Sequence, residues 1–384
     1  MADFSKVRDF IDSLENVDIN LCGIEIRQGH DIVLRHFMGY ADAEKKVKLC
    51  DEHLYWLFSC TKVITCLAAN RLIEEGRLGL DDTLDKYLPE FGNMLVKTPE
   101  GPVPAKNKIT ILDLITMSAG FTYDFKTPDF DEAKKNGLKS TRELVSVLAN
   151  RPLEFEPGTN YRYSLCHDVL AAVIEVVTGM KFGEYLDEIM FTPLGIKNMG
   201  FHLSPEQEKR MTVQYDYDSI FNKATVREPD NAYCLSEEYE SGGAGLFSNL
   251  SDYSKIIDAV ANGGVAENGY RLLKEETVAS LMVNHVKTEA QFMAYTKSPR
   301  WYGYGYGLCG RVMMNPLASL AKSSKGEFGW DGAACSYALI DPTKKLSVFL
   351  TTHVKGSSYL YERAHPCIRN MIYEAIDGDG LFSV

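Results

Sequence analysis

A serine and a lysine three residues apart open the most apolar segment of the chain. Ser59 and Lys62 begin the run SCTKVITCLAANRLI, whose pattern predicts a helix from residue 59 to about Glu75. Residues i and i+3 share a helix face, and backbone N–H groups in the first turn favour developing negative charge. Only Lys62 and Arg71 are charged in this run, so we expect Lys62 to be at least partly buried. A buried lysine without a partner loses its proton, and its amine can then accept the proton of a serine.

The serine–lysine spacing alone is a weak signal, because a chain of this length contains about one such pair by chance. A second pair does occur at Ser319 and Lys322, where the neighbouring Asn315-Pro316 predicts a loop. The alternative for the first pair is a purely structural role. Ser59 would then be a serine at the start of a helix, and Lys62 would pack its aliphatic chain against the protein while its amine reaches solvent. Two further segments favour chemistry, because Tyr163 precedes an apolar helix and Gly329-Trp330-Asp331-Gly332 opens a strand.

The order of these motifs resembles a known superfamily. SxxK is followed by PG…YxYS…VTG, then GGAGLFS…D, and then FGWDGAA with a later DP. This arrangement resembles the serine β-lactamase and penicillin-binding-protein superfamily, from about Gly23 to Thr352. It is most similar to the class C β-lactamase-like branch, which includes family VIII carboxylesterases and D-stereospecific peptidases.

The resemblance implies a role for each motif residue. Ser59 would be the acylated nucleophile and Lys62 its helix neighbour. Tyr163 would work with the lysine as general base and later as general acid, because a nearby cation stabilises a phenolate. The backbone N–H groups of Ser59 and Ala333 would form the oxyanion hole, where each donor contributes roughly 3 to 4 kcal/mol. No cofactor is expected.

Departures from the family pattern narrow the range of substrates that we expect. Leu165 stands where the second motif commonly ends in an asparagine that binds the acylamino group. Trp330-Asp331-Gly332 replaces the Lys-Thr-Gly that helps to hold a β-lactam carboxylate, and Asp331 would repel a carboxylate if it faced the site. A tryptophan there resembles the esterase branch, where the motif often begins Trp-Gly-Gly. His353 falls where class C enzymes usually have an asparagine near the substrate carboxylate, so it is either a substrate contact or a strand-end polar residue.

The elements that position these residues follow from the wider pattern. Two β-rich runs joined by Gln-Gly-His-Asp predict a hairpin after a first helix, and strand-like runs return from about Gln214 until a closing helix begins at Tyr359. Helical patterns dominate between them, including TLDKYLPEF and HDVLAAVIEVVTG. We predict an α/β fold of the α+β type, with an antiparallel sheet flanked by helices and an all-helical insertion. The sheet domain would comprise residues 1–80 and 201–384, and the insertion residues 81–200.

Composition excludes several other classes. The 384 residues contain 41 basic and 53 acidic side chains, a net charge of −12, which is opposite to what a nucleic-acid binder needs. The N-terminus has no apolar stretch of a secretory signal, and no segment is apolar enough for a membrane span. Nine cysteines without a CxxC pair predict reduced, buried thiols rather than disulfides or zinc. We therefore expect a cytoplasmic protein with no nucleic-acid or membrane partner, and the oligomeric state stays open.

Other motifs carry less weight. Gly305 to Gly310 fits GxGxxG, but no helix follows as dinucleotide binding requires. The alternating Tyr302, Tyr304 and Tyr306 predict a strand whose rings cover one face, either as a cleft wall or as packing. His167 either tunes Tyr163 or is a satisfied helix histidine. The histidine spacing indicates no metal site.

We predict a serine hydrolase that forms an acyl-enzyme on Ser59 and hydrolyses a small carboxylic ester. The enzymatic alternatives are an amide hydrolase, meaning a D-aminopeptidase or weak β-lactamase, and an acyltransferase that uses another alcohol as acceptor. A catalytically silent binding protein of the same fold is the alternative of a different class. The departures at Leu165 and Asp331 favour it, whereas the presence of Ser59, Lys62 and Tyr163 opposes it.

Overall fold

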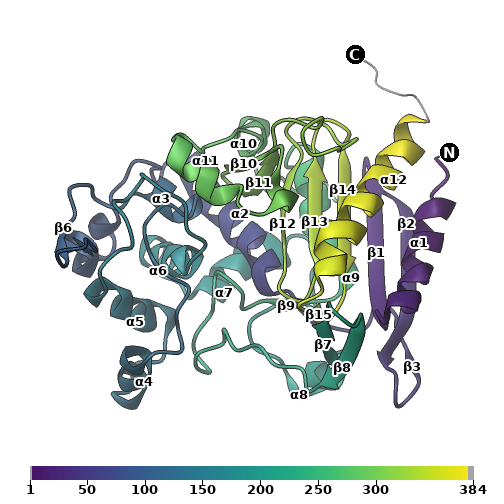
Figure 1. Cartoon of the computed structure of the whole chain (residues 1–384), viewed down its shortest axis with the longest axis horizontal. Coiled ribbons are helices and arrows are strands. Elements are labelled where there is room, and N and C mark those ends of the chain that lie inside the picture. The colour runs from purple at the N-terminus through teal and green to yellow at the C-terminus, as the bar shows by residue number, and fades with distance from the viewer. Residues whose placement is uncertain (1, 379–384) are drawn as a thin grey trace.

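The computed structural model describes residues 2–378 and is built around one large antiparallel sheet. Its eight strands follow the order β10-β11-β12-β13-β14-β1-β2-β3, with helices on both faces (Figure 1). The predicted fold class is confirmed. The strands are β1 (Leu21–Gln28), β2 (Asp31–Asp42), β3 (Val47–Lys48), β10 (Tyr304–Gly307), β11 (Gly310–Met313), β12 (Phe328–Asp331), β13 (Tyr337–Asp341) and β14 (Leu346–Thr351).

The two ends of the chain meet in the middle of this sheet. β1 pairs with β14, so that Gly23 lies opposite Thr351, and β1 also forms the predicted hairpin with β2. At the hairpin turn Gly29 and His30 both adopt positive φ, which suits a tight two-residue connection. The pairing of the N-terminal strand with the C-terminal one therefore joins segments more than 300 residues apart.

Helices cover both faces of the sheet. On one face α1 (Ser5–Ser13) packs with α12 (His365–Asp377) around an apolar cluster that includes Ile24 and Val348. On the other face α9 (Leu250–Ala261) lies against β14, β1 and β13, and Tyr253 stacks on Phe349 at 4.1 Å between ring centroids. α2 (Thr61–Glu74) belongs to this second, larger core. Buried apolar faces on both sides explain why the central strands read as nearly continuous hydrophobic runs.

The helical segments of the middle of the chain lie to one side of the sheet (Figure 1). They are α3 (Ile111–Ile115), α4 (Pro128–Lys135), α5 (Thr141–Val145), α6 (Cys166–Thr178) and α7 (Phe182–Leu186). The helix expected at TLDKYLPEF is wrong, because this segment forms two short 3-10 turns, Leu84–Lys86 and Pro89–Asn93. Pro89 lacks an N–H and holds Leu88 at φ −127° and ψ 82°, outside the helical region. The boundaries at residues 80 and 200 stay a prediction.

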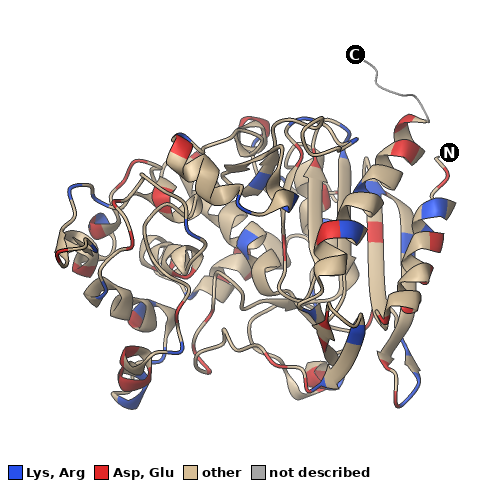
Figure 2. Cartoon of the chain, in the orientation of Figure 1, with Lys and Arg blue, Asp and Glu red and all other residues tan. Residues whose placement is uncertain are grey.

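Shorter elements complete the chain. They are β4 (Tyr55–Trp56), β5 (Leu95–Val96), β6 (Val103–Pro104), α8 (Pro205–Glu208), β7 (Gln214–Asp218), β8 (Lys223–Arg227), β9 (Phe247–Ser248), α10 (Glu275–Leu281), α11 (Glu289–Tyr295) and β15 (Val354–Lys355). Charged residues lie mainly on the outer helices and turns (Figure 2). Across residues 2–378, no helix combines the length and apolarity that crossing a bilayer requires. All nine cysteines are free thiols.

Candidate active site

The segment around Ser59 turns sharply before α2 begins. Phe58 to Cys60 form a 3-10 turn, and α2 starts at Thr61, two residues later than predicted. Phe58 has φ 47°, a left-handed conformation that costs a bulky L-residue of order 1 kcal/mol or more. Its fully buried ring packs edge-on against Tyr233 at 6.3 Å, which helps to hold that conformation. The turn places Ser59 just before the N-terminus of the buried helix α2, where 8 % of the residue is exposed.

Two side chains converge on the Ser59 hydroxyl, Lys62 from the next helical turn and Tyr163 from a distant part of the chain. The Tyr163 hydroxyl donates to Ser59 Oγ over 2.6 Å, and Lys62 Nζ donates to the same oxygen over 3.3 Å. Lys62 is 2 % exposed, in agreement with its expected burial, and its ammonium lies 4.6 Å from the centre of the Tyr163 ring. Proton transfer among the three groups is therefore within geometric reach.

A second tyrosine, which the sequence analysis missed, completes the surroundings of Lys62. Lys62 Nζ donates to Tyr123 Oη over 3.2 Å and to the carbonyl oxygen of Gly243 over 2.6 Å. The Tyr123 and Tyr163 rings stack in parallel, 5.2 Å apart. Burial raises the pKa of Tyr123 well above its usual value, so its hydroxyl stays protonated. Tyr123 lies in a loop after α3 and belongs to none of the motifs, so the sequence contained no signal for it.

Trp330 forms the opposite wall of the tyrosine pair. Its indole Nε1 donates to Tyr163 Oη over 3.3 Å, and its ring stacks on Tyr163 at 5.8 Å. Gly332 follows at a position where a Cβ would lie 2.4 Å from the Leu57 carbonyl oxygen, so a larger residue would push the end of β12 away from the Ser59 segment. Ala333 comes next, and its N–H stays the predicted second donor of the oxyanion hole.

Asp331 is paired with a buried arginine. Side chains alternate along a strand, and Asp331 lies on the opposite face of β12 from Trp330. Its Oδ1 accepts from Arg311 Nη1 over 2.7 Å, so a buried arginine compensates its charge. Asp331 therefore points toward Arg311 and not toward Ser59, and its contact with a substrate stays a prediction.

His353 lies inside the protein and is hydrogen-bonded through both ring nitrogens. It is fully buried, and its Nδ1 lies 3.1 Å from the Thr212 carbonyl oxygen, to which it donates. Its Nε2 accepts from the backbone N–H of Trp56 over 3.3 Å and from Gln214 Nε2 over 3.0 Å. Burial lowers the pKa of His353 to about 3, so the ring is neutral. These hydrogen bonds connect the residue after β14 with β4 and β7, which favours the alternative of a strand-end polar residue, and a substrate contact by His353 stays a prediction.

The remaining predicted residues pack within the protein or lie at its surface. Leu165 is 3 % exposed at the start of α6 and offers no polar group, so its substrate contact stays a prediction. His167 Nε2 lies 3.1 Å from the Ile115 carbonyl oxygen, whereas its Nδ1 is buried without a hydrogen-bond partner among residues 2–378, so neither predicted role is decided. Tyr306 packs edge-on against Trp330 at 5.2 Å, behind the cleft wall, whereas Tyr302 is half exposed. Gly305 to Gly310 form the β10–β11 hairpin, as the rejection of a dinucleotide site requires.

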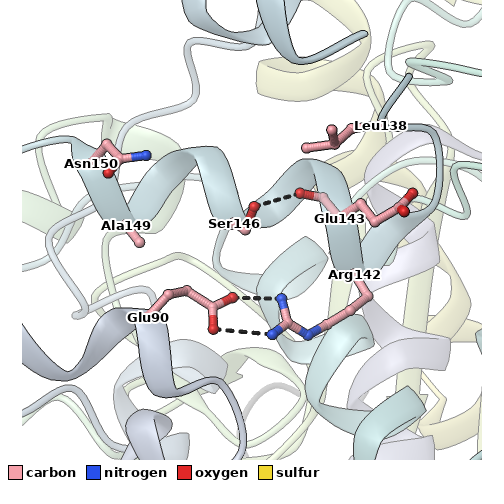
Figure 3. A pocket seen from close by; sticks show the side chains of 7 residues that line it. All are labelled: Glu90, Leu138, Arg142, Glu143, Ser146, Ala149 and Asn150. Carbon is pink, nitrogen blue, oxygen red and sulfur yellow. Dashed lines mark hydrogen bonds and ion pairs between the residues drawn. The ribbon is translucent and has the colours of Figure 1, made fainter. Parts of the chain in front are cut away.

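A large surface hollow lies elsewhere on the molecule. Figure 3 shows this hollow of about 560 Å³ on the helical side, where Arg142 reaches across to both carboxylate oxygens of Glu90. None of Ser59, Lys62 and Tyr163 lines it. The candidate chemistry instead belongs to the place where the Ser59 turn, Lys62 of α2, Tyr163 before α6 and Trp330 of β12 meet.

Comparison with known proteins places this arrangement among serine hydrolases. The family model described as Beta-lactamase matches residues 23–365. Esterase EstB of Burkholderia gladioli is 29 % identical over 358 residues, which cover 87 % of this chain and 86 % of EstB. Protein Rv1367c of Mycobacterium tuberculosis is 27 % identical over 327 residues, which cover 80 % and 79 % of the two chains.

Solved structures share the same architecture. EstCE1, described as a hydrolase with promiscuous acyltransferase activity, has a TM-score of 0.80 at 26 % identity, covering 96 % of this chain and 98 % of EstCE1. Simvastatin synthase LovD of Aspergillus terreus has a TM-score of 0.82 at 22 % identity, covering 99 % and 100 % of the two chains, and shows the fold alone.

Proposed function

Because the chain belongs to the beta-lactamase family of serine hydrolases, we propose that it hydrolyses small carboxylic esters through an acyl-enzyme on Ser59. One observation carries the proposal. The Ser59 hydroxyl lies 2.6 Å from the Tyr163 hydroxyl and 3.3 Å from the Lys62 ammonium. A serine becomes a nucleophile when a base shares its proton, and the phenol and the amine are the groups within reach.

The geometry supports a two-step reaction. In the first step the Tyr163 phenolate, stabilised by the Lys62 ammonium, takes the Ser59 proton while Oγ attacks the acyl carbon. The oxyanion that forms is bound by the backbone N–H groups of Ser59 and Ala333. Tyr163 then returns the proton to the departing alkoxide, which leaves as the alcohol. In the second step water repeats the sequence, releases the carboxylic acid and restores Ser59.

The surroundings favour an ester without an anionic recognition group. Leu165 and Trp330 occupy the positions where β-lactam enzymes of the family use an amide and an ammonium. The stacked rings of Tyr123, Tyr163 and Trp330 provide an apolar wall beside the nucleophile. EstB and EstCE1, which are an esterase and a hydrolase by name, support the same substrate class. An intracellular setting is part of the proposal and rests on the nine free thiols.

Acyl transfer to an alcohol other than water is the second candidate. The acyl-enzyme is common to both reactions, and only the acceptor differs. The observation that favours it is the structural similarity to EstCE1, for which acyltransferase activity is described. Adding a short alcohol to the esterase assay and measuring the new ester against the free acid separates the two outcomes.

The test combines labelling with substrate choice. Intact-mass analysis after exposure to a fluorophosphonate should show one adduct on wild type, none on Ser59→Ala, and one on the matched control Ser319→Ala, which alters the other serine–lysine pair. Wild type should hydrolyse p-nitrophenyl butyrate faster than nitrocefin. No adduct on wild type would favour a silent binding protein, and efficient nitrocefin hydrolysis with negligible esterase activity would favour an amide hydrolase.

A further inference from the structure

A buried carboxylate behind the catalytic lysine has no role in the reaction as described above. Asp168 lies in the first turn of α6 and is 1 % exposed. Its Oδ1 accepts from Tyr239 Oη over 3.0 Å and from Ser241 Oγ over 2.5 Å. Its Oδ2 is buried without a hydrogen-bond partner among residues 2–378. A buried polar atom without a partner is rare in folded proteins and calls for an explanation.

The unpartnered oxygen faces Lys62 across Gly243. A Cβ built on Gly243 would lie 2.5 Å from Asp168 Oδ2 and 3.4 Å from Lys62 Nζ, so the two charged atoms are at most about 6 Å apart. They are not in direct contact, because no carboxylate of the described residues lies within 4.0 Å of Lys62. Glycine at position 243 leaves this gap open, while its carbonyl oxygen accepts from Lys62 Nζ.

The electrostatics of this arrangement give Asp168 a function. The mechanism requires a positive Lys62 in a site with 2 % exposure, where an uncompensated charge is costly. An opposite charge within about 6 Å favours the charged form of a group, whereas direct pairing would draw the ammonium away from Ser59. Asp168 also lies where the N-terminus of α6 favours a carboxylate.

We propose that Asp168 is a positioning residue, which keeps Lys62 charged from behind Gly243 and leaves its N–H donors directed at Ser59 and Tyr123. This inference rests on the proposed function. Asp168 does not touch the substrate, and it acts through the lysine. The neighbouring helices α2 and α6, which pack side by side, bring the two groups together (Figure 1).

Other ionisable groups lie near Asp168 and Lys62. Their effects on the pH profile have to be distinguished from the effect of Asp168. These groups are Cys66 from α2, Cys166 and His167 from α6, Tyr123 and Tyr163 beside the nucleophile, and Tyr233, Cys234 and Tyr239 from the segment before Ser241. Burial raises the pKa of Tyr123, Tyr239, Cys166 and Cys234, so these groups are neutral at pH 7. Burial alone would raise the pKa of Cys66, but the Cys309 thiol, His167 and Lys62 lower it to about 5. A Cys66→Ala background therefore isolates the effect of Asp168.

The test compares two buried aspartates in equivalent helix positions. Asp168→Asn removes the charge behind Lys62, whereas Asp252→Asn alters the third residue of α9, which is also buried and accepts backbone N–H groups. The readout is the rate of fluorophosphonate labelling of Ser59 as a function of pH, expressed per folded enzyme. This readout separates a change of charge from a loss of folded protein.

Removing the negative charge of Asp168 makes the protonated forms of both Lys62 and Tyr163 less favourable. We therefore expect Asp168→Asn to move both limbs of the pH profile of labelling to lower pH by on the order of one unit. Asp252→Asn should leave both limbs in place, and the shift should persist in Cys66→Ala. If Asp168→Asn does not fold, Asp168→Ser provides the same comparison.

Unchanged limbs in a folded Asp168 variant would show that Asp168 is merely structural and would overturn the inference. The same holds if Asp252→Asn produces an equal shift. Failure of the proposed function is distinguishable, because wild type itself would then form no Ser59 adduct, and both proposals would fall together.

Discussion

Two buried cations lie on either side of strand β12, and their surroundings differ. Arg311 is fully buried, its Nη1 donates to Asp331 Oδ1 over 2.7 Å, and its Nη2 donates to the Ala338 carbonyl oxygen over 2.8 Å. Its guanidinium also lies 4.6 Å from the centre of the Tyr337 ring. Lys62 instead donates to three uncharged oxygens, those of Ser59, Tyr123 and Gly243.

The difference separates a structural cation from a chemical one. A guanidinium stays protonated in proteins, and a carboxylate in direct contact holds it in one place. A lysine amine can exchange its proton, and hydrogen bonds to neutral acceptors leave it free to respond to charge that develops nearby. β12 divides the two environments, because Trp330 faces Tyr163 beside Ser59 and Asp331 faces the arginine.

Removing the chemical cation should have the largest effect. We expect Lys62→Met to lower kcat/KM for p-nitrophenyl butyrate by 10³-fold or more, because the variant loses both the stabilised base and its counter-charge. Stability should be unchanged or higher, since a buried charge is replaced by an apolar side chain of similar length. Thermal unfolding followed by circular dichroism checks this. If Lys62→Met kept more than a tenth of the wild-type kcat/KM, the distinction drawn between Lys62 and Arg311 would be wrong.

Removing the structural cation should give the reverse pattern. Arg311→Met leaves Asp331 and the neighbouring Glu327 buried without their cation, which costs about 3 to 5 kcal/mol of unfolding free energy. Activity per folded molecule should stay within a few-fold of wild type. Urea unfolding measures the loss, with the exposed Arg363→Met as the matched control. Equal destabilisation by both variants would contradict the structural role.

The arginine side should also make the fold sensitive to acid. Burial, with a further contribution from Arg311, lowers the pKa of His365 to about 4. The unfolded chain takes up a proton below about pH 6.5 and the folded chain does not, so this contribution to stability is present at pH 7.5 and is lost as pH falls toward 4.

His365→Gln removes that titration while keeping a side-chain N–H for the Cys335 carbonyl oxygen. The difference in unfolding free energy between wild type and variant should therefore shrink by up to about 3 kcal/mol between pH 7.5 and 4. Urea unfolding at several pH values provides the measurement. A constant difference would show that His365 is not the buried neutral group that the structure describes.

A smaller effect on activity is expected at Tyr123, whose hydroxyl accepts a hydrogen bond from Lys62. Tyr123→Phe removes one of three hydrogen-bond acceptors of Lys62 and keeps the ring stacked on Tyr163. A hydrogen bond from a charged group contributes about 1.5 to 3 kcal/mol, so kcat should fall by roughly ten- to a hundredfold. Steady-state kinetics test this, with the half-exposed Tyr302→Phe as control. A loss as large as that of Lys62→Met would make Tyr123 part of the proton relay.

The sequence was informative where spacing is local. The i, i+3 relation placed Ser59 and Lys62 together, since helix geometry fixes such distances whatever surrounds them. The order of motifs indicated Tyr163, and the repeated strand patterns at both chain ends indicated the sheet. TLDKYLPEF misled because a helical pattern of apolar residues hid the effect of Pro89 on the backbone.

Only the tertiary structure decided the direction in which each side chain points and which distant residues it meets. A strand of four residues can present either set of side chains to a cleft, and only the pairing of β12 turned Trp330 inward and Asp331 toward Arg311. The approach of Tyr123 to Lys62, the burial of His353 and the gap between Asp168 and Lys62 join residues from separate loops and helices. No local rule sets such distances, because they follow from how the whole core packs.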